Sequence, residues 1–430
     1  MNIKDFIDKE YREFAVYNCV RTIPSIKDGL KLPQRKALFG VLDLNQKAKV
    51  STATSHIIKV SGYLHGESSM EDTVVRMAQK YPGANNIPLF EGDGQFGSRL
   101  SPEAAASRYI YVSPSNRIWE MFSKQDNEIL EHRFEEGSFI EPDSYFPVVP
   151  VCLVNGASGI GSGFATDIMA HRYSDLKKAI KEVLSKGKVK TPLVPSYEGF
   201  KGTTEKLENG QVLIKGTFKR VNTTTIEITE LPIGYHNDSY KEVLNRLIDD
   251  KFIKDYDNLS TEDEWKFIVY VPRTTTALTD DELMVKFKLI SRNTQNIVLW
   301  DTNDNLKIYE SVESVLEEFV EWRLGKYELL RNRLIDKSNS QVTELQEKMK
   351  FIQAWIDAPS EFSNKPKAVI HQKMVDRGVS AELVEKFMRI PVYSFTDEEI
   401  TSLRDKISEL KNYVVELQNT TAKDMYMEAL

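Results

Sequence analysis

The stretch AAASRYIYV, residues 104–112, places two tyrosines, Tyr109 and Tyr111, directly after Arg108 and a run of small residues. Isoleucine between the tyrosines, followed by valine, favours a β-strand. Residues two apart on a strand share a face, so both rings could simply be core aromatics. The local pattern favours that interpretation over a chemical role for either phenol, and only the surrounding sequence can decide between them.

The segments before this stretch read as short helices. LPQRKALFGVLDL, residues 32–44, has Pro33 in a first-turn position and then apolar residues at helical spacing. HGESSMEDTVVRMAQKY, residues 65–81, has acids in its first turn, where the helix dipole favours them. Two short helices followed by a strand are compatible with a winged helix-turn-helix. We therefore predict a winged-helix domain over residues 1–150.

The middle of the chain reads as a mixture of strands and helices. PVVPVCLV, residues 147–154, is predicted to be a buried strand that leads into a glycine-rich stretch. Strand-like runs at 211–218 and 224–232 then precede a helical run at 239–249. This pattern predicts an α+β tower domain over residues 151–305. Asp255 and Asp257 have the spacing of metal ligands, but their polar surroundings favour a solvated turn.

The last third predicts long helices. Apolar residues recur from Val312 to Leu334 at helical spacing, with one break at Arg323. A second stripe from Leu403 to Leu417 steps by four and three residues, as a coiled-coil seam does, and Thr396 with Glu399 predicts a capping box before it. We predict an antiparallel coiled coil from residues 306–357 and 396–430, with a small globular tip at 358–395. The fold class is thus α+β and multidomain.

Composition limits the location and the partners of the chain. No apolar run approaches the ~20 residues that cross a bilayer, and the first residues lack a signal-peptide core. The only cysteines are Cys19 and Cys152, which suits a reducing cytoplasm. The formal net charge is −7, yet residues 21–36 hold five bases and one acid. Charge alone fits a phosphate-binding patch and a solvated face equally well.

Several stretches together resemble the DNA breakage-reunion subunit of type IIA DNA topoisomerases. SIKDGLKLPQRKALF, GYLHGESSMEDTVVRMAQ, GDGQFGSRL, AASRYIYV and LVNGASGIGSGFAT occur in the order and spacing of that family. GTFKRVNTTTIEITELP and the ending LKNYVVELQNTTAKDMYMEAL are similar to more distal parts of it. The sequence is closer to the eukaryotic enzymes than to gyrase, and the length is similar to that of a bacteriophage cleavage subunit. The resemblance covers nearly the whole chain.

The resemblance implies a catalytic site. It assigns Tyr109, directly after the arginine, as the nucleophile that attacks DNA, and Tyr111 as an ordinary aromatic. Arg108 would hold the phosphate, because a guanidinium can bind phosphate at two points. His65 would lie near the scissile phosphate, as a cation, a hydrogen-bond donor or a relay for the phenol proton. Gyrase-like members carry a second histidine where this chain has Tyr63, so a role that needs two histidines is not expected.

The resemblance also implies how DNA is bound. Basic residues on family positions would contact the DNA backbone without reading sequence; they are Arg21, Lys31, Arg35 and Lys36. Ile160, between Gly159 and Gly161, would insert between base pairs and bend the duplex. A glycine-rich turn with a buried isoleucine is the alternative. Ser68 and Asp72 correspond to positions where gyrase-like relatives contact cleavage-stabilising drugs.

The implied activity is that of an ATP-dependent type II DNA topoisomerase. A homodimer would open a transient double-strand break through 5′-phosphotyrosyl linkages, pass a second duplex, and relax or decatenate DNA. The sequence contains no G-x-x-x-x-G-K-[ST] motif and no metal-binding carboxylate module, so Mg²⁺ and ATP are expected on a separate ATPase and metal-binding subunit. The alternatives are a non-catalytic, DNA-bending architectural protein with the same fold, and a coiled-coil scaffold.

Overall fold

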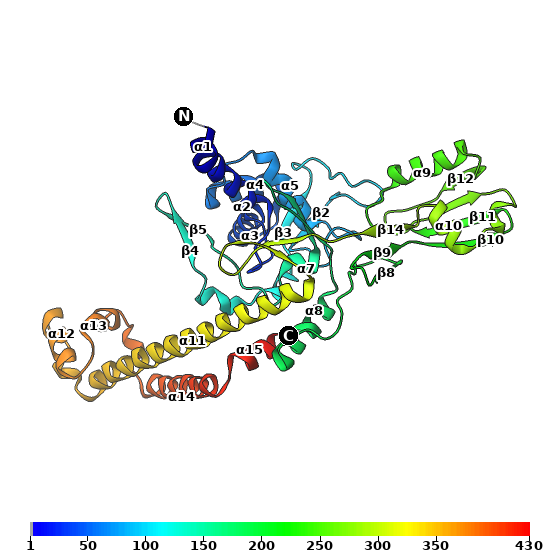
Figure 1. Ribbon diagram of the computed structural model, residues 1–430. Coiled ribbons are helices and arrows are strands. Elements are labelled where there is room, and N and C mark those ends of the chain that lie inside the picture. The colour runs from blue at the N-terminus through cyan, green and yellow to red at the C-terminus, as the bar shows by residue number, and fades with distance from the viewer. Residues whose placement is uncertain (1–2) are drawn as a thin grey trace. The chain divides into compact units, whose positions relative to one another are not determined.

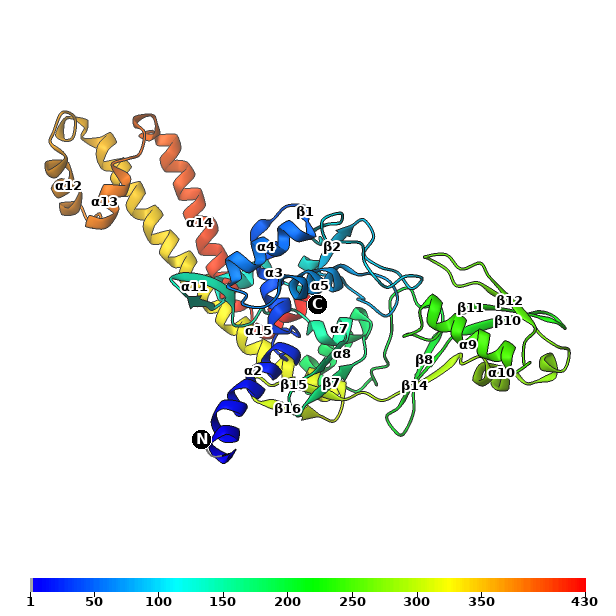
Figure 2. The ribbon, with the colours of Figure 1, turned by 90° about the horizontal axis from the view of Figure 1, so that it is seen from above.

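The computed structural model describes residues 3–430. The chain forms two compact units, one that extends to Arg323 and includes Leu430, and one of residues 324–429 (Figures 1 and 2). This division is coarser than the domains expected from sequence, and the boundaries at residues 150, 305, 357 and 395 remain predictions.

The first unit begins with helices that precede the AAASRYIYV stretch. They are α1 (Ile3–Asp5), the π-helix η1 (Phe6–Tyr11), α2 (Arg12–Thr22), α3 (Leu32–Leu44), α4 (Val50–Ser61) and α5 (Glu67–Ala78). The helices predicted at 32–44 and 65–81 are therefore confirmed as α3 and α5. A small sheet in the order β1-β3-β2 accompanies them, formed by β1 (Ala48–Lys49), β2 (Phe90–Asp93) and β3 (Tyr111–Pro114).

The strand at AAASRYIYV is shorter than predicted. Strand β3 begins only at Tyr111, and Tyr109 lies in the turn before it. The reason is that the preceding carbonyls are bound by the first turn of α4 instead of by a strand. The Val50 amide donates to the Ile110 carbonyl at 3.0 Å, and the Ser51 amide donates to the Ser107 carbonyl at 3.3 Å. The two tyrosines therefore do not share one face of a strand.

The predicted strand at PVVPVCLV is wrong. Residues Val151–Asn155 form a short buried helix, α7, which Pro150 precedes. The Pro150 carbonyl accepts the Leu153 amide at 3.0 Å, which turns the chain into a helix. A continuous apolar run does not distinguish a buried strand from a buried helix, and only the hydrogen bonds decide between them. The next elements are the two strands of a hairpin, β6 (Ala157–Ile160) and β7 (Ala165–Ile168).

The middle region contains the mixed strands and helices that the sequence predicts (green in Figure 1). The run at 211–218 is divided at Gly216 into two strands. One sheet has the order β10-β11-β13-β12 and contains β10 (Thr217–Asn222), β11 (Thr225–Glu230), β12 (Asp255–Asn258) and β13 (Phe267–Tyr270). The other has the order β14-β9-β8 and contains β8 (Thr203–Lys206), β9 (Val212–Lys215) and β14 (Ile290–Asn293). Helices α9 (Asn237–Asp249) and α10 (Asp280–Lys286) supply buried side chains to the core, such as Tyr240 and Leu283. Asp255 and Asp257 lie in β12, not in a turn as predicted, because β12 pairs with β13.

The remaining elements of the first unit connect these regions. They are α6 (Ile118–Met121), β4 (His132–Glu135), β5 (Ser138–Pro142), α8 (Tyr173–Lys186), β15 (Ile297–Trp300) and β16 (Leu306–Tyr309). Strands β4 and β5 form one hairpin, and β15 and β16 form another.

The long helices are also present. Helix α11 (Val312–Asp357) has 46 residues, and α14 (Asp397–Asn419) has 23. They run antiparallel, because Lys348 contacts Glu399 whereas Arg331, earlier on α11, contacts the later Thr420 (Figures 1 and 2). The apolar stripe of α14 is largely buried. Helices α12 (Lys367–Asp376) and α13 (Ala381–Phe387) pack around Phe351 in the segment between them, and α15 (Ala422–Ala429) follows α14.

Two local predictions for these helices are corrected. Thr396 caps α14 by accepting the Glu399 amide at 3.2 Å, but the Glu399 carboxylate accepts from Lys348 at 2.8 Å, so the reciprocal half of the box is replaced by an ion pair. Arg323 does not break the buried stripe of α11. Its guanidinium is fully buried and lies 2.7 Å from the Asp126 carboxylate, which makes a charged side chain compatible with that position.

Candidate active site

Tyr109 is held at the surface on a fixed loop. Its side chain is 65% exposed, whereas the next residue, Ile110, is buried. The Tyr109 amide donates to the Ala106 carbonyl at 2.9 Å, and the loop on either side is bound to the first turn of α4. The loop therefore presents a phenol to solvent while its neighbour anchors the backbone.

Arg108 and Tyr109 form a pair, and Tyr111 has different surroundings. The Arg108 guanidinium carbon lies 4.7 Å from the centre of the Tyr109 ring, so a cation accompanies the phenol. Tyr111 is 37% exposed, belongs to β3, and has the Lys47 ammonium 5.5 Å from its ring centre. Of the two tyrosines, only Tyr109 is both prominently exposed and adjacent to an arginine that has no ion pair among the described residues.

His65 lies in the loop between α4 and α5, immediately before Gly66, which caps α5. Its Nε2 forms a hydrogen bond with the Tyr17 hydroxyl, and the two rings are stacked with centres 5.8 Å apart. Tyr63 meets the same ring edge-on at 5.3 Å. Burial lowers the pKa of His65 from its ordinary value, and the nearby Arg21 lowers it further. Both effects favour the neutral form of the ring.

Tyr17 was missed by sequence reasoning. It lies 48 residues before His65 on α2, and a lone tyrosine on a helix has no distinguishing pattern. Tyr17 and Tyr63 together fix the orientation of the His65 ring, where sequence analysis could see only the histidine.

Two of the four predicted DNA-binding bases point into the protein. Arg35 pairs with the fully buried Asp28 at 2.7 Å. Lys36 is buried, 2.9 Å from Glu141, and also donates to the Ser61 carbonyl at 2.5 Å. The expectation that Arg35 and Lys36 bind the DNA backbone does not fit this arrangement, because their charges are already compensated. Without Arg35, Asp28 would be left buried and without a basic partner, which is strongly unfavourable.

The other bases of the cluster differ in their surroundings. Lys27 pairs with Asp304 at 2.8 Å. Lys31 donates to the Ser158 carbonyl at 2.5 Å, and burial, followed by the charge of Arg76, lowers its pKa. The Nε of Arg21 is buried without a hydrogen-bond partner among residues 3–430. Of the four predicted DNA-binding bases, Arg21 and Lys31 are therefore the two whose charge no carboxylate of the described chain compensates.

Ile160 lies at the end of β6 and is 83% exposed, which excludes the alternative of a buried isoleucine. Gly159 and Gly161, on either side of this residue, do not have positive φ angles. They allow close packing: a Cβ on Gly159 would lie 2.0 Å from the Thr22 carbonyl oxygen, and one on Gly161 would lie 2.9 Å from the Cys19 sulfur. The hairpin therefore lies directly against α2.

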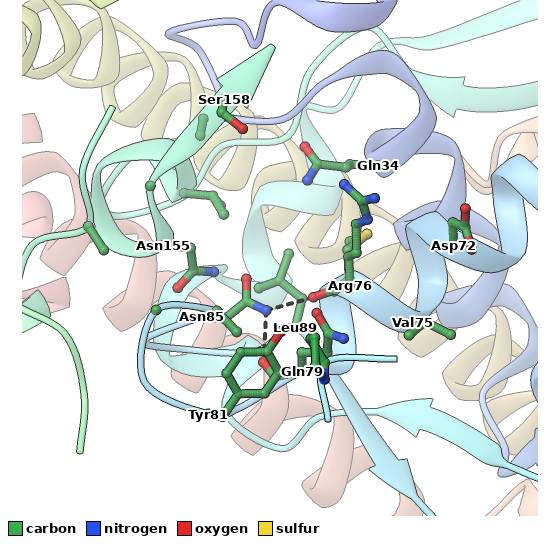
Figure 3. A pocket seen from close by; sticks show the side chains of 18 of the residues that line it. Gln34, Asp72, Val75, Arg76, Gln79, Tyr81, Asn85, Leu89, Asn155 and Ser158 are labelled. Atoms are coloured by element: carbon green, nitrogen blue, oxygen red, sulfur yellow. Dashed lines mark hydrogen bonds between the residues drawn. The ribbon is translucent and has the colours of Figure 1, made fainter. Parts of the chain in front are cut away.

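A cavity of about 930 Å³ lies next to these residues (Figure 3). Its lining includes Lys31, the 103–107 segment before Arg108, and Ser158 of the hairpin. Asp72 and Arg76 of α5 also line it, whereas Ser68 is exposed at the start of the same helix. The structure thus brings Asp72 together with Lys31 and the loop of Tyr109, but Ser68 is not part of this lining.

The described residues hold neither a cluster of metal ligands nor a membrane-spanning helix. Within residues 3–430, no group of three or more His, Cys, Asp or Glu side chains could hold a metal ion. Over the same residues, every helix is too short or too polar to cross a membrane.

Comparison with known proteins identifies the family. The family of the A-type subunits of DNA gyrase and topoisomerase IV matches residues 21–430. DNA topoisomerase 2 of Plasmodium falciparum is 33% identical over an alignment that covers 99% of this chain and 34% of that protein. DNA topoisomerase 2-alpha of Gallus gallus is 35% identical over 91% of this chain and 26% of its own length. This chain therefore spans about a third or less of these curated relatives.

A solved structure agrees with these matches. The crystal structure of the Plasmodium falciparum topoisomerase II DNA-binding, cleavage and re-ligation domain superposes with a TM-score of 0.92 at 32% identity, covering 99% of this chain and 63% of that one. The chain accordingly belongs to the DNA gyrase/topoisomerase IV family of A-type subunits and corresponds to the breakage-reunion region of the type IIA DNA topoisomerases.

Proposed function

We propose that this chain is the DNA-cleaving and religating part of a type II DNA topoisomerase and that Tyr109 is its nucleophile. The observation that carries the proposal is the exposed Tyr109 with the Arg108 guanidinium 4.7 Å from its ring centre, on a loop fixed to α4. An aromatic side chain of the hydrophobic core would be buried, as the side chain of the next residue, Ile110, is. The family match supports the same role.

The proposed reaction exchanges one phosphodiester for another. The Tyr109 oxygen forms a bond to phosphorus, and the bond from phosphorus to the 3′ oxygen breaks. The phenol proton passes to a base or to water, and the leaving 3′ oxygen takes up a proton. The DNA 5′ end is then joined to Tyr109, and the reverse steps reseal the strand. A phenol has a pKa near ~10, so neighbouring cations are needed to favour attack.

The neighbouring residues would act on charge and position. Arg108 would hold the non-bridging phosphate oxygens, on which negative charge increases during attack. Arg21 has a buried Nε without a partner in the described chain, so it can pair with a phosphate. His65 has a lowered pKa, which favours a neutral hydrogen-bonding role over a cationic one. Ile160 would enter the base stack as an apolar wedge.

We further propose the larger assembly that the resemblance implies. The first unit would contain the winged-helix gate and the tower. Helices α11 and α14 would form an antiparallel coiled coil, and the globular tip between them would form the exit gate. Two copies would cut opposite strands, and a second duplex would pass between them to relax or decatenate DNA. The antiparallel packing of the two long helices supports this reading.

Mg²⁺ and ATP belong, in this proposal, to a separate ATPase and metal-binding subunit. The described residues do not fit a metal site of their own, since they contain no suitable group of ligands. The curated relatives are roughly three to four times as long as this chain. Bound Mg²⁺ would stabilise charge on the leaving oxygen.

A covalent-trapping assay tests the proposal. The chain, the ATPase subunit from the same source, Mg²⁺ and supercoiled plasmid are mixed and quenched with detergent, and protein attached to 5′ DNA ends is measured. Wild type should form the adduct, Tyr109→Phe should form none, and Tyr111→Phe should form it normally. An adduct that survives Tyr109→Phe would refute the assignment of the nucleophile.

The second candidate is a DNA-bending architectural protein, which the exposed Ile160 favours by itself. It predicts a different outcome in the same assay. If the wild-type chain bends DNA but never forms a covalent adduct, the architectural function is correct and the topoisomerase proposal is wrong.

A further inference from the structure

A cavity of about 300 Å³ opens in the second unit, between the end of α11, the start of α12 and the residue that precedes the cap of α14. We propose that it binds a small amphipathic anion, that is, a molecule with an apolar body and one carboxylate or similar negative group. The inference does not depend on the proposed function, because no residue of this cavity takes part in the proposed reaction.

The walls of the cavity are apolar. Six of its eight lining residues belong to the hydrophobic core around Phe351; they are Phe351, Trp355, Ile370, Met388, Ile390 and Phe395. Phe351 is fully buried, whereas the other five are half-buried. The cavity is therefore an opening in a hydrophobic core, where the apolar body of a ligand would be removed from water.

Aromatic stacking forms one wall. The Trp355 ring stacks on Phe395 with ring centres 5.2 Å apart, and on Phe362 with ring centres also 5.2 Å apart. Phe351 contacts Phe395 in turn, with ring centres 6.2 Å apart. Rings packed against one another in this way cannot easily turn into the neighbouring space. The site is thus formed before a ligand arrives, which lowers the cost of binding.

The two remaining lining residues are cations, Lys365 and Lys367, and both are exposed, so they stand at the mouth of the cavity. Lys365 makes no ion pair within residues 3–430, and its amide donates to the Phe362 carbonyl at 3.3 Å, which fixes the backbone there. The Lys367 ammonium lies 4.0 Å from the carboxylate of Glu385, too far for a strong ion pair. No carboxylate of the described residues lines the cavity. This arrangement favours a negative group at the mouth.

The size of the cavity favours a small molecule over a segment of another protein. Pockets for small ligands have volumes of about 300–1,000 Å³, and this cavity is at the lower end of that range. A helix that docks in a groove needs apolar anchors over two turns, which a single cavity of this size does not accommodate. Octanoate has the required chemistry, an apolar chain and one carboxylate, and is the probe for the test.

Methionine methyl signals in nuclear magnetic resonance test the location of the site. Met388 lines the cavity, whereas Met374 is buried in the same core and does not line it. In the full chain with isotope-labelled methionine methyl groups, octanoate should shift the Met388 signal and leave the Met374 signal in place. Met388→Leu and Met374→Leu identify the two signals. An unmoved Met388 signal at millimolar octanoate would overturn the proposal.

A ligand series tests the apolar body and the charge separately. Hexanoate is two CH₂ groups shorter than octanoate and should bind roughly tenfold more weakly. Octanol has the same chain without the charge and should bind roughly two- to tenfold more weakly at low salt, while octylammonium, with the opposite charge, should bind weakest. Equal affinities of hexanoate and octanoate would show that the chain does not enter the cavity. Equal affinities of octanoate and octylammonium would show that the site does not select an anion, and either result would overturn the proposal.

Charge reversal tests the two lysines. Lys365→Glu combined with Lys367→Glu should weaken octanoate binding at least twofold and strengthen octylammonium binding, measured from the Met388 shift. Both side chains are exposed, so the fold should be retained. Lys411→Glu is the matched control, an exposed lysine of α14 that does not line the cavity, and it should leave both affinities unchanged. Unchanged octanoate affinity in the double variant, or an equal loss in Lys411→Glu, would contradict the role of Lys365 and Lys367.

Discussion

Two fully buried carboxylates, Asp28 and Glu141, lie beneath the surface that we propose faces DNA. Each has a basic partner from α3, so a segment rich in positive charge presents less of that charge to solvent than its sequence suggests. An acid in such a position depends on its partner, because an uncompensated buried charge is far more costly than an exposed one.

Arg35→Leu should therefore lower the free energy of unfolding by about 3–5 kcal/mol, because it leaves Asp28 buried and unpaired. Urea denaturation followed by circular dichroism measures this change. Lys27→Met is the matched control, since its partner Asp304 is largely exposed and such pairs contribute about 0–1 kcal/mol. Equal losses in the two variants would contradict the structural role of Arg35.

His171 makes stability depend on pH. Burial lowers the pKa of this ring from 6.5 to about 4. Between pH 6.5 and about 4, the His171 ring binds a proton in the unfolded chain but stays neutral in the folded chain. The contribution of the neutral ring to the free energy of unfolding is therefore complete above pH 6.5. It is lost as the pH falls toward about 4, and the total loss is about 3 kcal/mol.

The expected result for His171→Phe is a flatter pH profile between pH 6.5 and 4 than that of wild type, measured by urea denaturation at each pH. An unchanged slope in His171→Phe would show that other groups govern acid sensitivity.

Candidate site residues could be selected from the sequence only where a motif defined them. The resemblance selected Tyr109, Arg108, His65 and Ile160, and the structure leaves Tyr109, Arg108 and Ile160 exposed and His65 partly exposed. The resemblance could not reveal that Arg35 and Lys36 are paired internally, because Glu141 is 105 residues from Lys36 in the sequence. Charge patterns report what a segment contains but not which side chains face inward.

Among the elements, the hairpin β6–β7 depends most on glycine. Gly159→Ala should displace this hairpin, since the added Cβ would lie 2.0 Å from backbone that cannot move aside easily. We expect a loss of about 1–3 kcal/mol in the free energy of unfolding, as overpacking typically causes. The measurement is urea denaturation.

The control for this substitution is Gly325→Ala on α11, where nothing lies within 4 Å of the added atom. Alanine is the better helix former, so this variant should gain up to about 1 kcal/mol. If both substitutions shift stability in the same direction, close packing of Gly159 is not the cause.

Elements with clear periodicity were well predicted from sequence. Helices α3, α5, α11 and α14 have apolar spacing or capping residues that local rules recognise. Helix α7 was not predicted, because its uninterrupted apolar residues lack periodicity and its turn depends on carbonyls of Pro150 and Asp28. Strand β3 begins only at Tyr111, and this late start depends likewise on amides of the distant helix α4.

At the scale of the whole molecule, the two compact units have separate cores. Phe351 belongs to a cluster in the second unit, and Phe267 to a cluster in the first. Calorimetry of the full chain should accordingly show two unfolding transitions. Phe351→Ala should lower the midpoint of one and Phe267→Ala that of the other, each by losing about 3–5 kcal/mol. A single transition that moves in both variants would mean that the units unfold together.

The exposed isoleucine has a consequence for anyone who engineers this chain. Procedures that improve expression commonly replace apolar surface side chains with polar ones, because such side chains promote aggregation. Ile160, at 83% exposure, would be among the first residues selected. A variant improved in this way would be easier to purify and would keep its fold, but it would lack the side chain that we propose deforms a duplex, and neither yield nor solubility would reveal that loss.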